Sequence, residues 1–189
     1  VTMKELTALL VCVLAYFLYT HVIRKQLFLR KVASRSGTKY LVRNLPDQKD
    51  AANLLDELGG TLVSLIEGCG SEKGERKEAV ERVRKKFDPT SLTENIPGSS
   101  HVAYSVNKGS ELSICLRHKD TEEFHDINTI RFVAIHELAH IMSKSSGHTD
   151  EFWDNMKFLL EDAVEIDIYK PVDYSKEQGH YCGDDITNN

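Results

Sequence analysis

The segment Asn128–Lys144 constrains this chain more than any other, because it has the length of a helix and almost no polar face. Its sequence is NTIRFVAIHELAHIMSK, and Asp126 or Asn128 can serve as the N-cap. The polar side chains between Ile130 and Met142 are Arg131, His136, Glu137 and His140. A helix that is apolar nearly all round is expected to run through a protein interior. Two imidazoles and a carboxylate are costly to bury there unless they have partners.

The spacing of these polar residues predicts a metal site. His136 and His140 are four residues apart, so they project from one face of the helix, about one turn apart. Two imidazole nitrogens in this geometry can chelate a tetrahedral zinc ion. Glu137 is then placed to hold a zinc-bound water and to take its proton as general base. This H-E-x-x-H pattern is typical of metallopeptidases. The alternative interpretation is that the two histidines are core residues and that the glutamate lies on the helix surface.

A third candidate ligand follows the helix. His148 comes after Ser145-Ser146-Gly147, whose glycine can end the helix and turn the chain back toward the metal. Asp150 and Glu151 are alternative oxygen ligands and rank below His148. Three neutral imidazoles would leave Zn²⁺ with an open position for chemistry. The predicted ligands are His136, His140 and His148.

The longer string HELAHIMSKSSGHTDEFW resembles the WLM group of zinc metallopeptidases, relatives of the SprT/Spartan proteases. That group combines H-E-L-x-H with a short loop, a third histidine and an aromatic pair, which here is Phe152-Trp153. The stretches VRNLPDQKDAANLL, SHVAYSVNKG, DINTIRFVAIHELAHI and IYKPVDY are similar to membrane-anchored WLM-like proteins of large DNA viruses. The resemblance covers about residues 40–182.

The resemblance implies an α+β, zincin-like fold, in which the active-site helix lies beside a small antiparallel sheet. It also implies hydrolysis of peptide bonds in a protein or peptide substrate. The runs HVAYSVN and ELSICLR, joined by Lys108-Gly109-Ser110, predict a hairpin. An extended substrate could bind there, near residues 103–106 or 112–116. Candidates for stabilising the oxyanion are Tyr104, Tyr169, Tyr174 and Tyr181.

An apolar run occupies the amino-terminal part of the sequence. Leu6–Ile23 contains 18 residues without Asp, Glu, Lys or Arg. A helix of this length rises about 27 Å, close to the roughly 30 Å hydrocarbon core of a bilayer. Tyr16, Tyr19 and His21 gather near its carboxyl end, where rings favour the membrane boundary. We therefore expect one transmembrane helix at residues 6–23, with a buried core helix as the alternative.

Charge is distributed unevenly after this run. Residues 24–43 contain seven Lys/Arg and no acid, whereas residues 44–189 contain 16 Lys/Arg and 28 Asp/Glu. The positive-inside rule then predicts a single-pass membrane protein whose carboxyl-terminal domain is cytosolic. The basic stretch either binds anionic lipid headgroups or only fixes topology. An acidic main domain argues against tight nucleic-acid binding.

The expected organisation is a tail at 1–5, a transmembrane anchor at 6–23, a basic juxtamembrane segment at 24–45, a WLM-like metallopeptidase domain at 46–182 and a tail at 183–189. The cysteines have no C-x-x-C pair, and we interpret Cys69, Cys115 and Cys182 as small buried residues or idle thiols. Unpaired thiols fit a reducing compartment. The histidines interpreted as surface or structural residues are His101, His118, His125 and His180.

Three functions from different classes follow. The first is a membrane-anchored zinc metallopeptidase that acts on proteins near the cytosolic face. The alternative is a membrane-anchored structural or minor capsid component of a virion, at its inner membrane and in contact with capsid proteins. The third, a DNA–protein crosslink protease, is disfavoured by the acidic charge. An intact Glu137 favours the first, because a purely structural zinc site needs no general base.

Overall fold

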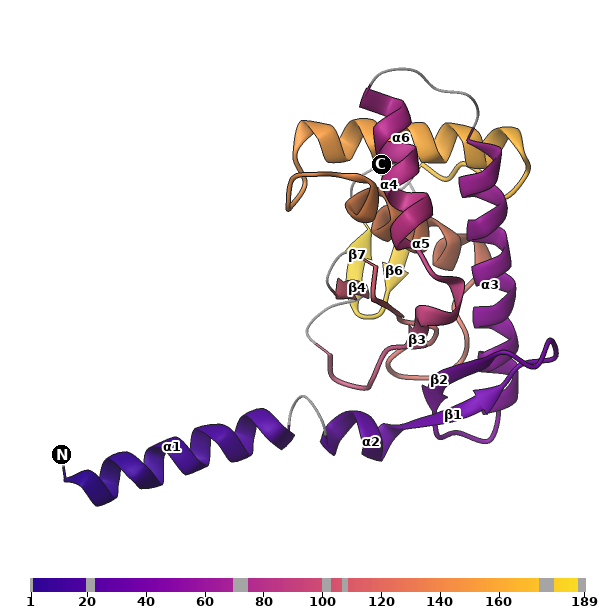
Figure 1. Ribbon diagram of the computed structural model, residues 1–189. Helices are drawn as coiled ribbons and strands as arrows, with labels where there is room; N and C mark the ends of the chain where they lie inside the picture. The colour runs from indigo at the N-terminus through magenta and orange to yellow at the C-terminus, as the bar shows by residue number, and fades with distance from the viewer. Residues whose placement is uncertain are drawn as a thin grey trace.

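The computed structural model describes residues 2–19, 23–69, 75–99, 103–106, 109–173 and 179–186. The chain folds into helices around a five-stranded sheet, with one amino-terminal helix that extends away from this body (Figure 1). The helices are α1 (Met3–Leu18), α2 (Arg24–Phe28), α3 (Gln48–Gly68), α4 (Glu75–Lys86), the 3₁₀ turn η2 (Pro89–Ser91), α5 (Ile127–Met142) and α6 (Asp150–Glu165). The strands are β1 (Leu29–Ala33), β2 (Lys39–Arg43), β3 (Leu92–Glu94), β4 (Ala103–Val106), β5 (Glu111–Ile114), β6 (Gly179–Tyr181) and β7 (Asp184–Ile186).

The main sheet has the strand order β1-β2-β3-β5-β4. The pairs β1–β2 and β4–β5 are antiparallel, whereas β2–β3 and β3–β5 are parallel. The predicted hairpin is thus confirmed as β4–β5, but the sheet is mixed rather than antiparallel. The reason is that α3 and α4 separate β2 from β3 along the chain, and such a crossover can return a strand parallel to its neighbour. β4 is an edge strand, which matters for the site described below.

The basic segment predicted at residues 24–45 is part of this sheet. β1 and β2 form its outer hairpin, with Leu29 opposite Arg43 and Ala33 opposite Lys39. In β2 the side chains alternate, so that Tyr40 and Val42 are buried while their neighbours are more exposed. Period-two burial of this kind is typical of a strand with one face on a core. Arg30, Lys31 and Lys39 of this hairpin are exposed, whereas Arg43 forms an ion pair with Glu122.

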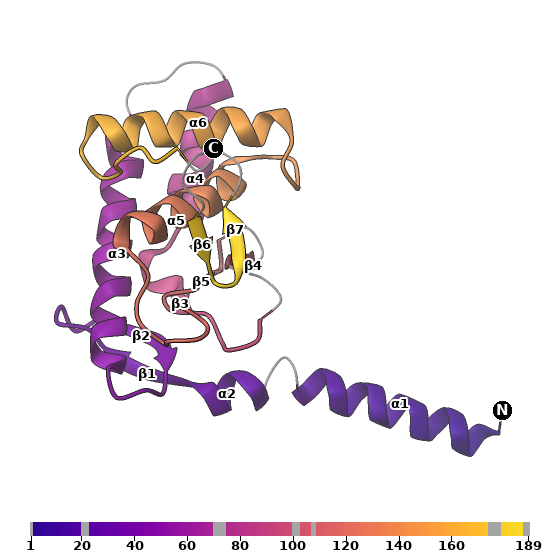
Figure 2. The same cartoon turned by 180° about the vertical axis from the view of Figure 1, so that it is seen from behind.

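Helix α3 forms the long support on which the sheet and the other helices pack. Its buried residues recur at helical spacing; they are Ala51, Ala52, Leu55, Leu58, Gly59, Leu62, Leu65 and Ile66. Gly59 allows η2 to approach closely, because a Cβ at this position would lie 3.1 Å from the Cβ of Pro89. Figures 1 and 2 show α3 running beside the sheet and reaching α6 at its far end. α5 contacts α3 and the strands β4 and β5, and α4 and α6 pack against it.

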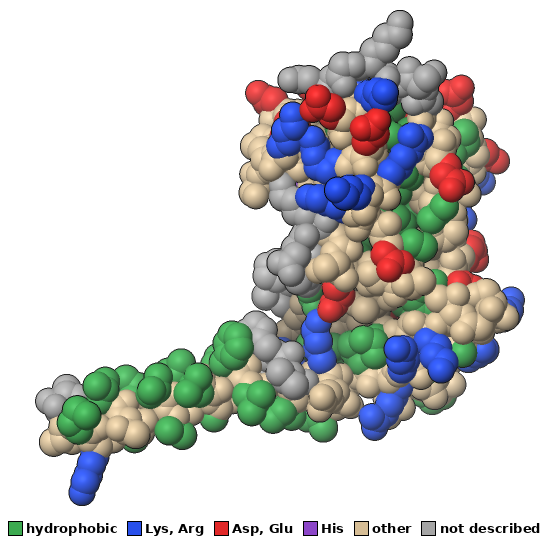
Figure 3. Space-filling model, in the orientation of Figure 1, with side chains coloured by type: hydrophobic (Ala, Val, Ile, Leu, Met, Phe, Trp, Pro, Cys, Tyr) green, Lys and Arg blue, Asp and Glu red, His purple; other side chains and the backbone are tan. Residues whose placement is uncertain are grey.

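The amino-terminal helix corrects one prediction. α1 has 16 residues, which rise about 24 Å, less than the roughly 30 Å of a bilayer core. Its large hydrophobic side chains are 50% to 79% exposed and line the projecting helix in Figure 3. Within the described ranges, no helix combines the length and the apolarity needed to cross a membrane. The predicted transmembrane helix at 6–23 is therefore wrong, and so is the single-pass localisation; residues 20–22 lie outside the described ranges.

The cysteines correct a second prediction. Cys115 and Cys182 form a disulfide, although 67 positions separate them, so the interpretation as idle thiols was wrong for this pair. Cys12 and Cys69 are free. The disulfide joins the residue after β5 to the turn between β6 and β7, and β7 lies within residues 183–189, where a tail was expected. It attaches this carboxyl-terminal hairpin to the main sheet.

Candidate metal centre

Helix α5 carries the H-E-x-x-H motif through the interior. Asp126 is its N-cap, and the Asp126 carboxylate accepts the backbone N–H of Thr129 at 3.1 Å. At the other end Ser143 is extended, and its hydroxyl donates to the carbonyl of Ala139 at 2.7 Å. Nine of the 16 residues of α5 are buried, among them Glu137. The expected interior helix is confirmed, and its polar residues are held at fixed positions.

Three imidazole rings meet at one point. His136 and His140 project from α5, and His148 reaches them from the loop between α5 and α6. Nε2 of His136 lies 3.2 Å from Nε2 of His140 and 3.0 Å from Nε2 of His148. Two nitrogens bound to one tetrahedral zinc at 2.0–2.1 Å are roughly 3.3 Å apart. The convergence of three ring nitrogens at these distances fits a zinc ion.

The loop that carries His148 turns at Gly147. This glycine has φ of +80°, in the left-handed region, and a Cβ added there would meet nothing within 4 Å. The requirement for glycine is therefore one of backbone conformation and not of space. The sequence predicted that this residue turns the chain back toward the metal. The turn lies within the loop, after α5 has already ended at Met142, and it brings His148 to His136.

Glu151 organises the same loop from the first turn of α6. Its carboxylate accepts the backbone N–H groups of Lys144 and Ser145 at 2.8 and 3.0 Å, and the Ser145 hydroxyl at 2.7 Å. These hydrogen bonds lower the pKa of Glu151 to about 2, because they favour the ionised form. The two alternative oxygen ligands are not part of the histidine cluster. Glu151 binds loop amides, and Asp150 is exposed at the start of α6.

Phe152 packs against all three imidazole rings. It is fully buried, and its ring centroid lies 4.8 Å from that of His136, 4.3 Å from His140 and 4.7 Å from His148. Trp153 lies beside His148, with ring centroids 5.6 Å apart. The resemblance gave Phe152-Trp153 only as an aromatic pair, and the contact of these rings with the histidines was not predicted. A signal was available, because His148 directly precedes the N-cap Thr149 and Phe152 lies in the first turn of α6.

Glu137 lies next to the imidazoles and beside a cavity. Its side chain is largely buried, and this burial raises its pKa to about 7. Burial, together with the charges of His140 and His148, lowers the pKa of His136 to about 4. A cavity of about 260 Å³ is lined by Glu137 and His140, by residues 103–105 of β4 and by residues 145–147 of the loop. An edge strand, a carboxyl group and an imidazole therefore face one cavity.

The four candidate tyrosines lie in different places. Tyr104 borders the cavity. Tyr169 is buried in the core, and the Tyr181 hydroxyl donates to the carbonyl of Cys115. Tyr174 lies outside the described residues, as do His101 and the side chain of His180. The Tyr104 side chain interacts with Lys25, whereas Tyr181 has an electrostatic interaction with Glu137.

The model of the WLM domain family matches residues 78–189, more than half of the sequence and all of the histidine site. The chain belongs to the WLM domain family. It is 32% identical over 151 residues to uncharacterized protein R325 of Acanthamoeba polyphaga mimivirus, over 78% of this chain and 77% of that protein. It is 36% identical over 69 residues to uncharacterized protein 042R of Invertebrate iridescent virus 3, over 36% of this chain and 43% of that protein. The predicted family and its occurrence in large DNA viruses are confirmed.

A solved structure gives the same fold. Wss1 from Saccharomyces cerevisiae is similar with a TM-score of 0.52 and 22% identity, over 67% of this chain and 87% of that chain. The α+β architecture predicted from the sequence is thus confirmed without its transmembrane helix. Membership of the family makes this a metallopeptidase-like protein, for which proteins are the expected substrates.

Proposed function

We propose that this protein is a zinc-dependent peptidase whose metal ligands are His136, His140 and His148. The observation that carries the proposal is the convergence of three Nε2 atoms, 3.0 and 3.2 Å apart, beside a buried glutamate and a cavity. Imidazole nitrogens are preferred zinc ligands, and three of them are typical of catalytic sites. A zinc ion held there would supply Lewis acidity toward a water molecule and a carbonyl group.

Glu137 is the general base in this proposal. Its pKa of about 7 lies near neutral pH, where a carboxyl group can both accept and return a proton. The Glu137 carboxylate takes a proton from the attacking water and delivers it to the leaving amine. Its burial keeps bulk water from competing for that proton, and α5 fixes its distance from the imidazoles.

The edge of β4 is the proposed binding place for an extended substrate. β5 pairs with one side of β4, and within the described residues no strand pairs with the other side, where an extended substrate could add a strand along the cavity. Within the described residues, the Ser105 hydroxyl is one of two buried side-chain groups without a hydrogen-bond partner, and it lines the same cavity. A peptide lying there would offer it a carbonyl oxygen. Residues 112–116, the other expected binding segment, begin in β5, which lies between β3 and β4.

Exchanging Glu137 for Gln tests the proposal. The full chain with zinc should cleave an unfolded protein, and Glu137→Gln should lose about 10²–10⁴-fold in rate while retaining the metal. Glu161→Gln is the matched control, because that carboxylate is 66% exposed on α6 and should leave the rate unchanged. If wild type and Glu137→Gln both hold zinc and are equally inert on diverse proteins, peptidase activity is refuted and a structural role is favoured.

A further inference from the structure

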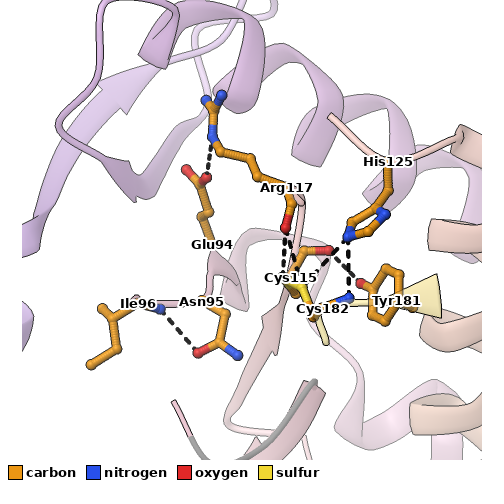
Figure 4. The surroundings of a disulfide bond; sticks show 8 residues. All are labelled: Glu94, Asn95, Ile96, Cys115, Arg117, His125, Tyr181 and Cys182. Carbon is orange, nitrogen blue, oxygen red and sulfur yellow. Dashed lines mark hydrogen bonds and ion pairs between the residues drawn. A yellow bond between two sulfur atoms is a disulfide. The ribbon is translucent and has the colours of Figure 1, made fainter. Parts of the chain in front are cut away.

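A second cluster of metal-binding side chains lies away from the three histidines. Cys115 follows β5, His125 precedes α5, and Cys182 lies in the turn between β6 and β7 (Figure 4). The two sulfurs and one ring nitrogen of His125 lie within 4.8 Å of one another. Cysteine and histidine are the residues that bind zinc in structural sites. Three segments far apart in sequence thus bring a Cys₂His set together.

His125 is buried against the disulfide, and its Nε2 accepts the backbone N–H of Cys182 at 3.3 Å. Its side chain is 6% exposed, and its Nε2 lies 3.6 Å from Sγ of Cys182. A nitrogen and a sulfur bound to the same tetrahedral zinc, at about 2.0 and 2.3 Å, are also roughly 3.6 Å apart. The His125 ring also contacts the rings of His118 and Tyr181, with centroids 3.8 and 4.6 Å away. An imidazole nitrogen beside two cysteine sulfurs is a ligand combination that zinc accepts, and Nε2 of His125 could exchange its hydrogen bond for such a bond.

We propose that Cys115, His125 and Cys182 form a second zinc site when the disulfide is reduced. Two equivalents of a small thiol reduce the bond: the cysteines gain two electrons and two protons, and the small thiol becomes its own disulfide. Zinc then displaces the two protons and binds both thiolates and Nε2 of His125. Reduction allows the sulfurs to separate to roughly 3.8 Å, the spacing of two sulfurs on tetrahedral zinc.

The surroundings provide access and a place for a fourth ligand. Both cysteines border a cavity of about 250 Å³, which a small thiol or a water molecule can enter. The carbonyl oxygen of Arg117 lies 3.2 Å from Sγ of Cys115 and 3.3 Å from Sγ of Cys182, so it can accept their S–H groups in the reduced, metal-free state. The Arg117 carbonyl can therefore bind the thiols before zinc does, and the cavity gives the small thiol access to the disulfide.

The consequence is that the β6–β7 hairpin stays attached under both redox conditions. In the oxidised chain the disulfide holds it to the sheet, and in the reduced chain zinc would hold the same residues. Tyr181 adds a hydrogen bond to the carbonyl of Cys115 in the same place. This site is separate from the histidine centre, so neither proposal depends on the other.

Metal binding to the full chain tests this inference. The chelator-treated protein is prepared with its disulfide intact or reduced, and is then titrated with Zn²⁺ and separately with Co²⁺. We expect one more bound zinc per chain after reduction, and near-ultraviolet absorption from cobalt–thiolate bonds. Cys182→Ser should abolish both effects. Cys69→Ser, the same exchange at a buried free cysteine, should abolish neither.

Cysteine alkylation tests the second site even if the Cys182→Ser variant does not fold, because it uses the wild-type chain. In the reduced wild type, zinc should protect two cysteines from alkylation, and His140→Ala should preserve this protection because it affects the other centre. Equal alkylation rates with and without zinc, together with no gain in metal on reduction, would refute the second site. Loss of metal from the histidine centre alone would count against the peptidase proposal and leave this one intact.

Discussion

The two clusters differ in how the chain assembles them. His136, His140 and His148 come from one helix and the loop that follows, and 12 positions separate the first from the last. Cys115 and Cys182 are 67 positions apart, and the Cys₂His set comes from three segments. The histidines are partly exposed beside a cavity, whereas His125 and Cys182 are buried.

This difference indicates that the two clusters have different roles, one in function and one in stability. A locally built site keeps its geometry through one helix, so it can remain open to a substrate. A site drawn from distant segments connects those segments, so removing it affects the whole fold. We therefore expect changes around the Cys₂His set to alter stability more than changes around the histidine loop. Three measurements test this difference, beginning with the largest effect.

The largest effect is expected at Arg117. Its side chain is 2% exposed, and its Nε donates to Glu94, a carboxylate that is 1% exposed, at 2.7 Å. The guanidinium also donates to both oxygens of Asp47, at 2.7 and 2.9 Å. Arg117→Ala leaves the buried Glu94 without this cation, and removing one partner of such a pair costs about 3–5 kcal/mol in the free energy of unfolding.

Urea denaturation measures this change in stability. The control is Lys157→Ala, which removes an exposed i,i+4 pair with Glu161 and should cost less than about 0.5 kcal/mol. Similar losses for the two variants would show that the ion pair beneath the Cys₂His set does not stabilise the fold, and the proposed difference in roles would fail.

Reduction of the disulfide is expected to have the next largest effect. In metal-free protein it should lower the free energy of unfolding by about 2–4 kcal/mol, because the reduced unfolded chain regains the freedom that a long closed loop removed. Added Zn²⁺ should restore part of that stability if the second site exists. Cys182→Ser is the control, since its stability should not respond to a reductant. A wild type equally stable before and after reduction would contradict this prediction.

The same difference explains which features the sequence could predict. The four-residue spacing of His136 and His140 places them on one helical face whatever the rest of the fold does. Gly147 and His148 follow within one loop, so the return of His148 toward His136 was also predictable. The hairpin β4–β5 is another local feature, and it was correctly predicted.

Long-range features were not predictable in this way. Nothing in the spacing of Cys115 and Cys182 indicates that they meet, because their approach depends on how β6 and β7 pack against the sheet. Residues 24–45 were interpreted by charge, yet Tyr40 and Val42 show the alternation of a buried strand. The length of α1 was also misjudged, since an apolar run does not determine where a helix ends.

The smallest effect concerns the loop that presents His148. Glu151 accepts two backbone N–H groups and one hydroxyl from Lys144 and Ser145, and Glu151→Gln should cost about 1 kcal/mol in metal-free protein at neutral pH. The folded pKa of about 2 lies below the ordinary value of 4.5. The stabilisation is therefore fully present above about pH 4.5 and is lost as the pH falls toward 2.

The difference in stability between wild type and Glu151→Gln should accordingly narrow between pH 4.5 and pH 2. Asp150→Asn, at the adjacent exposed position, is the control and should show a smaller difference at neutral pH. Glu151→Gln should also weaken zinc binding at the histidine centre, because a looser loop holds His148 less firmly. If the variant loses several kcal/mol, the loop stabilises the fold as much as the Cys₂His set does, and the two clusters are not divided by role.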